Sequence, residues 1–187
     1  MKAYLNNVKK LFEYYKLLGE KSIGRLTAEQ LLYYPNENTN SIAVIVKHMR
    51  GNMLSRWTDF LTSDGEKPWR SRDDEFNEEV LTKEDVLRLW NEGWTSFKNA
   101  LASITENDLD KIIFIRNEGL TVLDAINRQL AHYSYHVGQI IFMSKQSSDH
   151  EWESLSIPKN NSSAFNKEKF ANEKEIKSFT DAQIKKL

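Results

Sequence analysis

Four segments of the chain repeat apolar residues at intervals of three and four, which is the spacing of one face of an α-helix. These segments are Ala3–Leu18, Ser41–Leu61, Thr82–Ile104 and Val122–Lys145. A helix with one apolar face is stable only when that face is buried against another element. Strong strand patterns are missing, so we expect an all-α fold: an up-and-down four-helix bundle with short connecting elements.

The starts of these helices carry side chains that can satisfy free backbone amides. Ser41, Thr82 and Thr121 each stand directly before a periodic segment, where a hydroxyl accepts a hydrogen bond from the first turn. Asp85 follows Thr82 by three residues and completes a capping box. The predicted connections are a short helical turn before Pro35, a long loop at 62–79, and a small extended run, IIFI, closed by an Asn-Glu-Gly turn.

The length of 187 residues suits one well-packed domain and is too short for two domains of ordinary size. Beyond Ser147 the composition turns to Ser, Asn, Lys and Glu, and the helical pattern becomes weak. We therefore expect residues 1–166 to form the domain, with an irregular C-terminal arm at its end, and residues 167–187 to form a tail.

Charge and apolar runs exclude several classes of partner. The 26 basic residues nearly cancel the 27 acidic ones, so we expect no broad basic field that would attract nucleic acid or an anionic membrane. No apolar run approaches the roughly 20 residues that span a bilayer, and the first segment lacks the apolar core of a secretion signal. These features favour a cytoplasmic protein.

The chain contains no cysteine. Disulfides, thiolate metal ligands and a cysteine nucleophile are therefore excluded. Any metal ion must be held by histidine and carboxylate side chains, and any thiol chemistry must use a thiol from outside the protein.

Two of the four histidines stand one helical turn apart in the segment QLAHYSYHVGQI. His132 and His136 share a flank of the apolar stripe, so their imidazoles can reach one point. His48, on the flank of the second long helix, is the candidate third ligand. Three neutral imidazoles with an open fourth position are typical of a catalytic metal site. The alternative is a pair of hydrogen-bonded histidines at a helix flank.

His48 on the second long helix, followed by HYSYHVGQI on the last, resembles the DinB/YfiT-like superfamily of metal-dependent enzymes. The residues that match its pattern are His48, His132, His136, Gly138 and Gln139. The stretches GEKPWRSRDDEF and SLSIPKNNSSAFN are similar to a subgroup found in bacilli and related bacteria. The resemblance covers roughly residues 1–166 and implies a DinB-like four-helix bundle.

The resemblance also implies a divalent metal ion, zinc or nickel, held by the three histidines. Members with assigned activity are thiol transferases that use bacillithiol, mycothiol or glutathione. We therefore expect a thiol S-transferase that conjugates a small-molecule thiol to an electrophile, and the resemblance suggests a homodimer. The alternatives are a metal-dependent hydrolase and a non-catalytic helical protein that binds a ligand or a partner.

Four further residues are candidates for binding substrate. Arg70 and Arg72 could pair with carboxylates of an anionic cosubstrate, although a solvated charged loop explains them better. Trp57 could line an apolar pocket, but an aromatic residue at helical spacing is usually part of the core. Gln139 could order a ligand or a water molecule, or simply face solvent. Tyr133 and Tyr135 are expected to lie away from the histidines.

Overall fold

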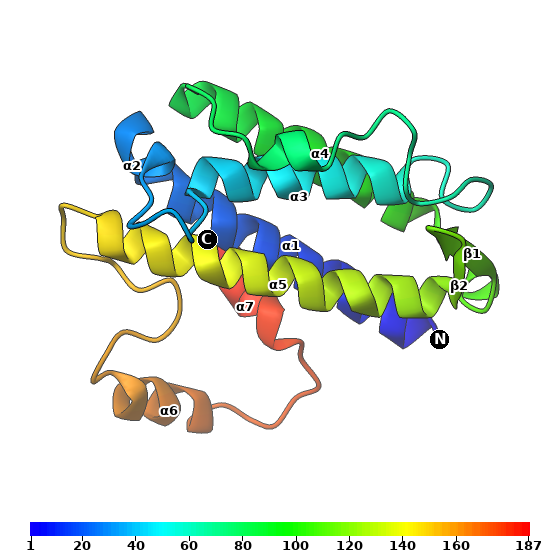
Figure 1. Ribbon diagram of the computed structural model, residues 1–187. Coiled ribbons are helices and arrows are strands. Elements are labelled where there is room, and N and C mark those ends of the chain that lie inside the picture. Colours follow the sequence, from blue (N-terminus) through cyan, green and yellow to red (C-terminus); the bar gives the residue numbers. More distant parts are fainter.

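Four long helices pack around a shared core in the computed structural model, which describes residues 1–187 (Figure 1). They are α1 (Lys2–Gly24), α3 (Ile42–Trp57), α4 (Lys83–Ser103) and α5 (Val122–Ser147). The shorter elements are α2 (Ala28–Leu32), the 3₁₀ helices η1 (Asp73–Phe76) and η2 (Glu106–Asp108), strands β1 (Ile112–Ile115) and β2 (Glu118–Thr121), α6 (Ser162–Phe170) and α7 (Phe179–Lys186). The predicted all-α four-helix bundle is confirmed.

The predicted caps form at the starts of three long helices. The Ser41 hydroxyl accepts from the backbone of Val44, and Thr121 accepts from the third residue of α5. Thr82 and Asp85 make the full reciprocal capping box at the start of α4. Each such cap contributes about 1 kcal/mol, because it satisfies amides that have no partner within the helix.

The long helices follow the order up, down, down, up rather than strict alternation (Figure 1). Helices α1 and α5 run parallel, and near their starts Tyr4 donates to Asn127 at 2.7 Å. Helices α3 and α4 also run in the same direction, with Trp57 and Phe97 in ring contact toward their ends. The connection 58–82 therefore returns along α3, which corrects the predicted up-and-down order.

Aromatic side chains fill the centre of the bundle. Phe12, Trp94, Phe97 and Tyr133 are at most 1% exposed, and their ring centroids lie 4.5–6.5 Å apart in edge-on contacts. Such pairs contribute about 0.5–1.5 kcal/mol each beyond the burial of apolar area. This group, called the aromatic core below, joins α1, α4 and α5.

The connection 58–82 is fastened to α3 and to the β1–β2 hairpin by polar contacts. The Ser55 hydroxyl donates to the Gly65 carbonyl at 2.7 Å, and the Asp64 carboxylate accepts from the backbone amides of Arg116 and Asn117. Both of these turn residues have left-handed backbones, with φ of 56° and 63°. The carboxylate thus stabilises the backbone of this turn at Arg116 and Asn117.

The C-terminal arm is more regular than predicted. Helix α7 packs on α1: Lys10 pairs with Asp181 at 2.6 Å, Phe179 meets Tyr14 edge-on, and Thr180 is fully buried. Helix α6 crosses the predicted boundary at residue 166, has no buried residue and stands off the bundle (Figure 1). The segment predicted as a tail, residues 167–187, therefore contains a packed helix, α7.

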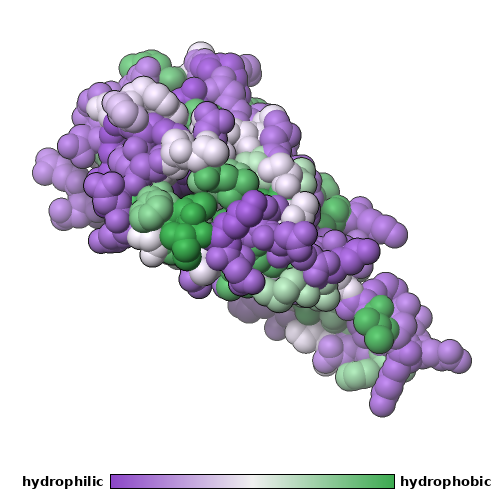
Figure 2. Space-filling model, turned by 90° about the vertical axis from the view of Figure 1, so that its right-hand side faces the viewer, coloured by the Kyte–Doolittle hydropathy of each residue, from purple (hydrophilic) through white to green (hydrophobic).

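The end of the bundle that carries the hairpin is largely polar, with an apolar patch near the middle of the view (Figure 2). Strand β1 alternates, so that Ile113 and Ile115 are buried while Ile112 and Phe114 are more than half exposed.

None of the helices is both long and apolar enough to cross a membrane. The predicted homodimer stays a prediction.

Candidate metal centre

His48 from α3 meets His132 and His136 from α5, as their positions on the helices predicted. One ring nitrogen from each lies within 4.8 Å of the others, and the Nε2 atoms of His48 and His132 are 3.4 Å apart. His48 and His136 are less than one tenth exposed. The antiparallel arrangement of α3 and α5 brings together residues that are 84 positions apart in the sequence.

Each histidine has a hydrogen-bond partner on its other ring nitrogen, Nδ1. The three pairs are His48 with the Glu75 carboxylate at 3.0 Å, His132 with Gln129 Oε1 at 3.3 Å, and His136 with Gln139 Oε1 at 2.8 Å. Carboxylate and amide oxygens only accept, so each Nδ1 carries the proton. In the neutral rings, every Nε2 therefore keeps a free lone pair, and metal-binding histidines are commonly oriented in this way.

The Nε2 atoms face one another inside this frame. His136 Nε2 is buried without any hydrogen bond. The Nε2 atoms of His48 and His132 are 3.4 Å apart, and in neutral rings with the proton on Nδ1 neither of them can donate to the other. An unsatisfied buried acceptor costs about 1–3 kcal/mol, so the arrangement is unfavourable unless a cation lies among the rings. Tetrahedral zinc with bonds of 2.0–2.1 Å holds its ligand nitrogens about 3.3 Å apart, which the separation of His48 and His132 matches.

The protonation state of the rings suits metal binding. Burial lowers the pKa of His132 to about 3, and repulsion from His136 and His48 adds to the effect. Burial also lowers the pKa of His136 to about 4, although its hydrogen bond with Gln139 acts in the opposite direction. Both imidazoles are therefore neutral near pH 7, the form in which histidine binds a metal ion.

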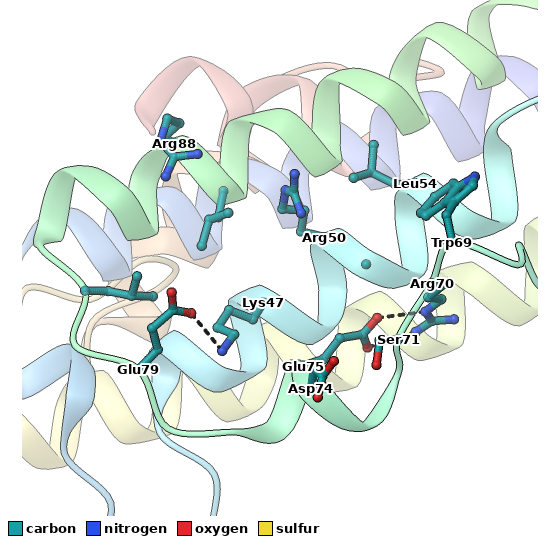
Figure 3. Close-up of a pocket in the computed structure, with 13 residues that line it drawn as sticks. Lys47, Arg50, Leu54, Trp69, Arg70, Ser71, Asp74, Glu75, Glu79 and Arg88 are labelled. Carbon is teal, nitrogen blue, oxygen red and sulfur yellow. Dashed lines mark hydrogen bonds and ion pairs between the residues drawn. The ribbon is translucent and has the colours of Figure 1, made fainter.

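Glu75 is held against His48 by the loop that crosses α3. Arg70 donates to both of its carboxylate oxygens, at 2.7 and 2.9 Å, and Figure 3 shows this pair reaching along the helix. Burial raises the pKa of Glu75, but the bonds from His48 and Arg70 outweigh it and hold the pKa below its usual value. A Cβ atom on Gly51 would lie 2.0 Å from the carboxylate, so this glycine makes room for it.

A cavity of about 400 Å³ opens beside the histidines. His48 and His132 form part of its wall, together with Gln129 and Tyr135. The Tyr135 ring also packs 4.2 Å from the His136 ring, centroid to centroid. Tyr135 was expected to lie away from the histidines, and that expectation is wrong. A ligand in this cavity would therefore meet the triad at His48 and His132.

The four candidates for substrate binding have different places. Trp57 lies in the core and donates to the Tyr133 hydroxyl at 3.3 Å, so it does not line the cavity. Arg70 lines the cavity, but only 2% of its side chain is exposed and its guanidinium is bound to Glu75. Arg72 lines the cavity and is half exposed. Gln139 positions His136.

Two partners of the histidines were given no role from the sequence. Helical geometry places Gln129 on the face of the histidines, three residues before His132, and the same spacing joins His136 to Gln139. Glu75 lies on a separate loop, and the one signal was a glycine, Gly51, in the middle of a long helix.

Comparison with known proteins adds a family and no activity. A family model described as "Protein of unknown function (DUF1572)" matches residues 1–161, a range that includes the three histidines and their partners. No curated protein matches the chain. The resemblance to the DinB/YfiT-like superfamily therefore stays an expectation.

Proposed function

The chain belongs to the DUF1572 family, and we propose that it is an enzyme that depends on a divalent metal ion held by its three histidines. One observation carries the proposal: three Nε2 lone pairs converge while every Nδ1 is fixed by an oxygen acceptor. A histidine cluster that served only to form hydrogen bonds would be expected to offer donors to these nitrogens, because buried acceptors without donors are unfavourable.

The ligand set favours zinc or nickel. Imidazole suits both ions, and three protein ligands with one open position are typical of catalytic rather than structural zinc. His48, His132 and His136 would hold the ion, and the open position would face the cavity. Glu75, through its bond to His48, would make that ring a stronger ligand.

The reaction we propose is the transfer of a small-molecule thiol to an electrophile. When bound, the ion would lower the pKa of a thiol at its open position, so that a thiolate nucleophile forms near neutral pH. The sulfur would form a bond to the electrophilic carbon as the leaving group departs, and the thiol proton would pass to solvent. The cysteine-free chain fits this chemistry, since the thiol must come from outside.

The test of the metal site is the metal content of purified protein, before and after reconstitution with zinc or nickel. We expect one ion per chain in the wild type and a large loss in His48→Ala. His150→Ala is the matched control, because His150 lies in an exposed segment outside the triad. Wild-type protein that holds no metal after reconstitution would overturn the proposal.

The test of the reaction uses the metal-loaded protein with bacillithiol, mycothiol or glutathione and a chromogenic aryl halide. Conjugation that requires both the thiol and the three histidines would support the transferase. Turnover of an ester or amide substrate without added thiol would instead favour a metal-dependent hydrolase. A protein that binds the ion but catalyses neither reaction would be a non-catalytic binding protein.

A further inference from the structure

Positive charge is concentrated around the cavity beside the histidines. Five arginines line it, and no acidic side chain does: Arg56 of α3, Arg70 and Arg72 of the connection 58–82, Arg116 of the hairpin turn, and Arg128 of α5. The whole chain carries a net charge of −1, so this concentration is local. Side chains from four separate segments must meet to produce it.

Two of these arginines are occupied with holding the fold together. Arg56 donates to the Gly65 carbonyl at 2.7 Å and to Glu66 at 3.0 Å, and Arg70 donates to both oxygens of Glu75. Their side chains are only 6% and 2% exposed. They contribute charge to the cavity, but their buried guanidinium groups already have acceptors within the protein.

The other three arginines are more exposed, and their guanidinium groups keep N–H donors that have no acceptor in the protein. Arg72 is half exposed, and its nearest carboxylate, on Asp73, is 3.8 Å away. Arg116 is 56% exposed and shares Glu66 with two other arginines. Arg128 is exposed and makes no ion pair. The carboxylates of Glu66, Glu75 and Asp73 thus leave two of the five positive charges uncompensated, before any metal ion adds its own.

A second cavity, of about 320 Å³ on the neighbouring face of α3, has no such excess of unpaired positive charge. Its cationic side chains have partners: Lys47 pairs with Glu79 at 3.0 Å (Figure 3), and Arg50 and Arg88 both pair with Glu92. The excess of guanidinium groups is therefore a property of the histidine cavity and not of every hollow in the surface.

We infer that the cavity binds a small molecule with at least two anionic groups, carboxylates or phosphates, on Arg72, Arg116 and Arg128. This substrate class deepens the proposed function and rests on it for the reacting group, which would lie at His48 and His132. A guanidinium pairs bidentately with either anion. A volume of about 400 Å³ suits a small metabolite rather than a polymer.

The experiment is calorimetric titration of metal-reconstituted and metal-free protein with three probes: succinate, its monoamide succinamate, and inorganic phosphate. Succinate should bind at least about tenfold more tightly than succinamate, because each charged pair is worth roughly that factor. The relative affinities of succinate and phosphate distinguish a carboxylate site from a phosphate site.

The matched variants are the double substitution Arg72→Gln with Arg128→Gln, and the control Arg88→Gln. Arg88 is 56% exposed, close to the 50% of Arg72, but lies on the other cavity. The double variant should keep its metal and lose at least about tenfold in succinate affinity, and the control should bind as the wild type does. Equal binding of succinate and succinamate, or a double variant that binds as the wild type does, would overturn the inference.

Metal-free protein separates this inference from the proposed function. Succinate binding that persists without metal, and falls in the double variant, supports the anion site even where no metal-dependent reaction is found. Succinate binding that disappears with the metal and ignores the arginine substitutions means that the anion binds the ion alone, which overturns the inference and leaves the metal site standing.

Discussion

The aromatic core and the histidine centre are neighbours on α5, where His132 and Tyr133 are consecutive residues, yet different forces stabilise them. Tyr133 lies among rings in contacts that have little directional demand. His132 lies among acceptors and lone pairs, each of which must point correctly. Helix α5 therefore stabilises the fold through one face. On the adjacent face it carries histidine nitrogens whose arrangement is unfavourable without a bound cation.

The boundary between the two regions is a short chain of hydrogen bonds. Trp57 donates to the Tyr133 hydroxyl at 3.3 Å, and that hydroxyl donates to Asn52 at 3.1 Å. Asn52 in turn forms part of the wall of the arginine-lined cavity. A substitution can therefore disturb the aromatic core without removing a metal ligand, and another can remove a ligand without disturbing the core. The following variants test this separation.

The largest expected effect comes from the core. Trp94→Ala should lower the free energy of unfolding by about 3–5 kcal/mol, because a fully buried indole leaves a cavity. The protein that remains folded should still bind one metal ion per chain. Urea unfolding and metal analysis on the same samples measure both, and loss of metal from folded protein would show that the regions are coupled.

The second effect comes from the centre. His136→Ala should weaken metal binding by more than about 100-fold, since even removing a ligand's partner costs 10–100-fold. The metal-free protein should lose much less stability than Trp94→Ala does, because the substitution also removes a buried nitrogen that has no partner. Competition with a chromogenic chelator gives the affinity. A large loss of stability in the metal-free protein would contradict this, because it would show that the histidine centre also stabilises the fold.

Glu75→Gln addresses the partner of a ligand. The amide keeps the shape but loses the charge that strengthens His48, so metal affinity should fall by about 10–100-fold. Arg70, with 2% of its side chain exposed, would also lose its partner, and some stability should be lost with it. The same chelator competition measures the affinity, and an unchanged value would mean that Glu75 has only a structural part.

The smallest effect is expected from Gly51→Ala, for which metal affinity and stability are measured separately. The new Cβ would displace the Glu75 carboxylate and lower metal affinity by about tenfold or less. Displacing Glu75 also disturbs its pair with the buried Arg70, but alanine favours the helix by up to about 1 kcal/mol, so the metal-free protein should lose less stability than Glu75→Gln does. Gly138→Ala is the control, because nothing lies within 4 Å of its Cβ position. A fall in metal affinity in the control as well would contradict this explanation.

Sequence patterns predicted the helices because their information is local. Periodic apolar residues indicated four stripes, and Ser41 and Thr121 cap their helices as expected. The direction of α4 could not be read in this way, since it depends on where the connection 58–82 docks, through Asp64 and Ser55. A loop position fixed by polar contacts has no period.

The candidate metal centre was likewise predictable only where its information is local. The histidines share helical faces, so their meeting followed from spacing and from the resemblance to a known superfamily. The cavity arginines come from α3, a loop, a turn and α5, and only the folded chain brings them together. Helix α7 was missed because one packed face on a short polar helix leaves too weak a pattern.

The parallel pairing of α1 with α5 has a consequence for the order of assembly. Tyr4 and Asn127, which are bonded in the folded protein, are 123 positions apart, so the first long helix emerges from the ribosome well before its partner. Contacts so distant in sequence slow folding relative to bundles with local pairing. Until α5 is synthesised, His48 stands alone on α3. A nascent chain therefore has no three-histidine centre, and the ion can be captured only by a nearly complete polypeptide.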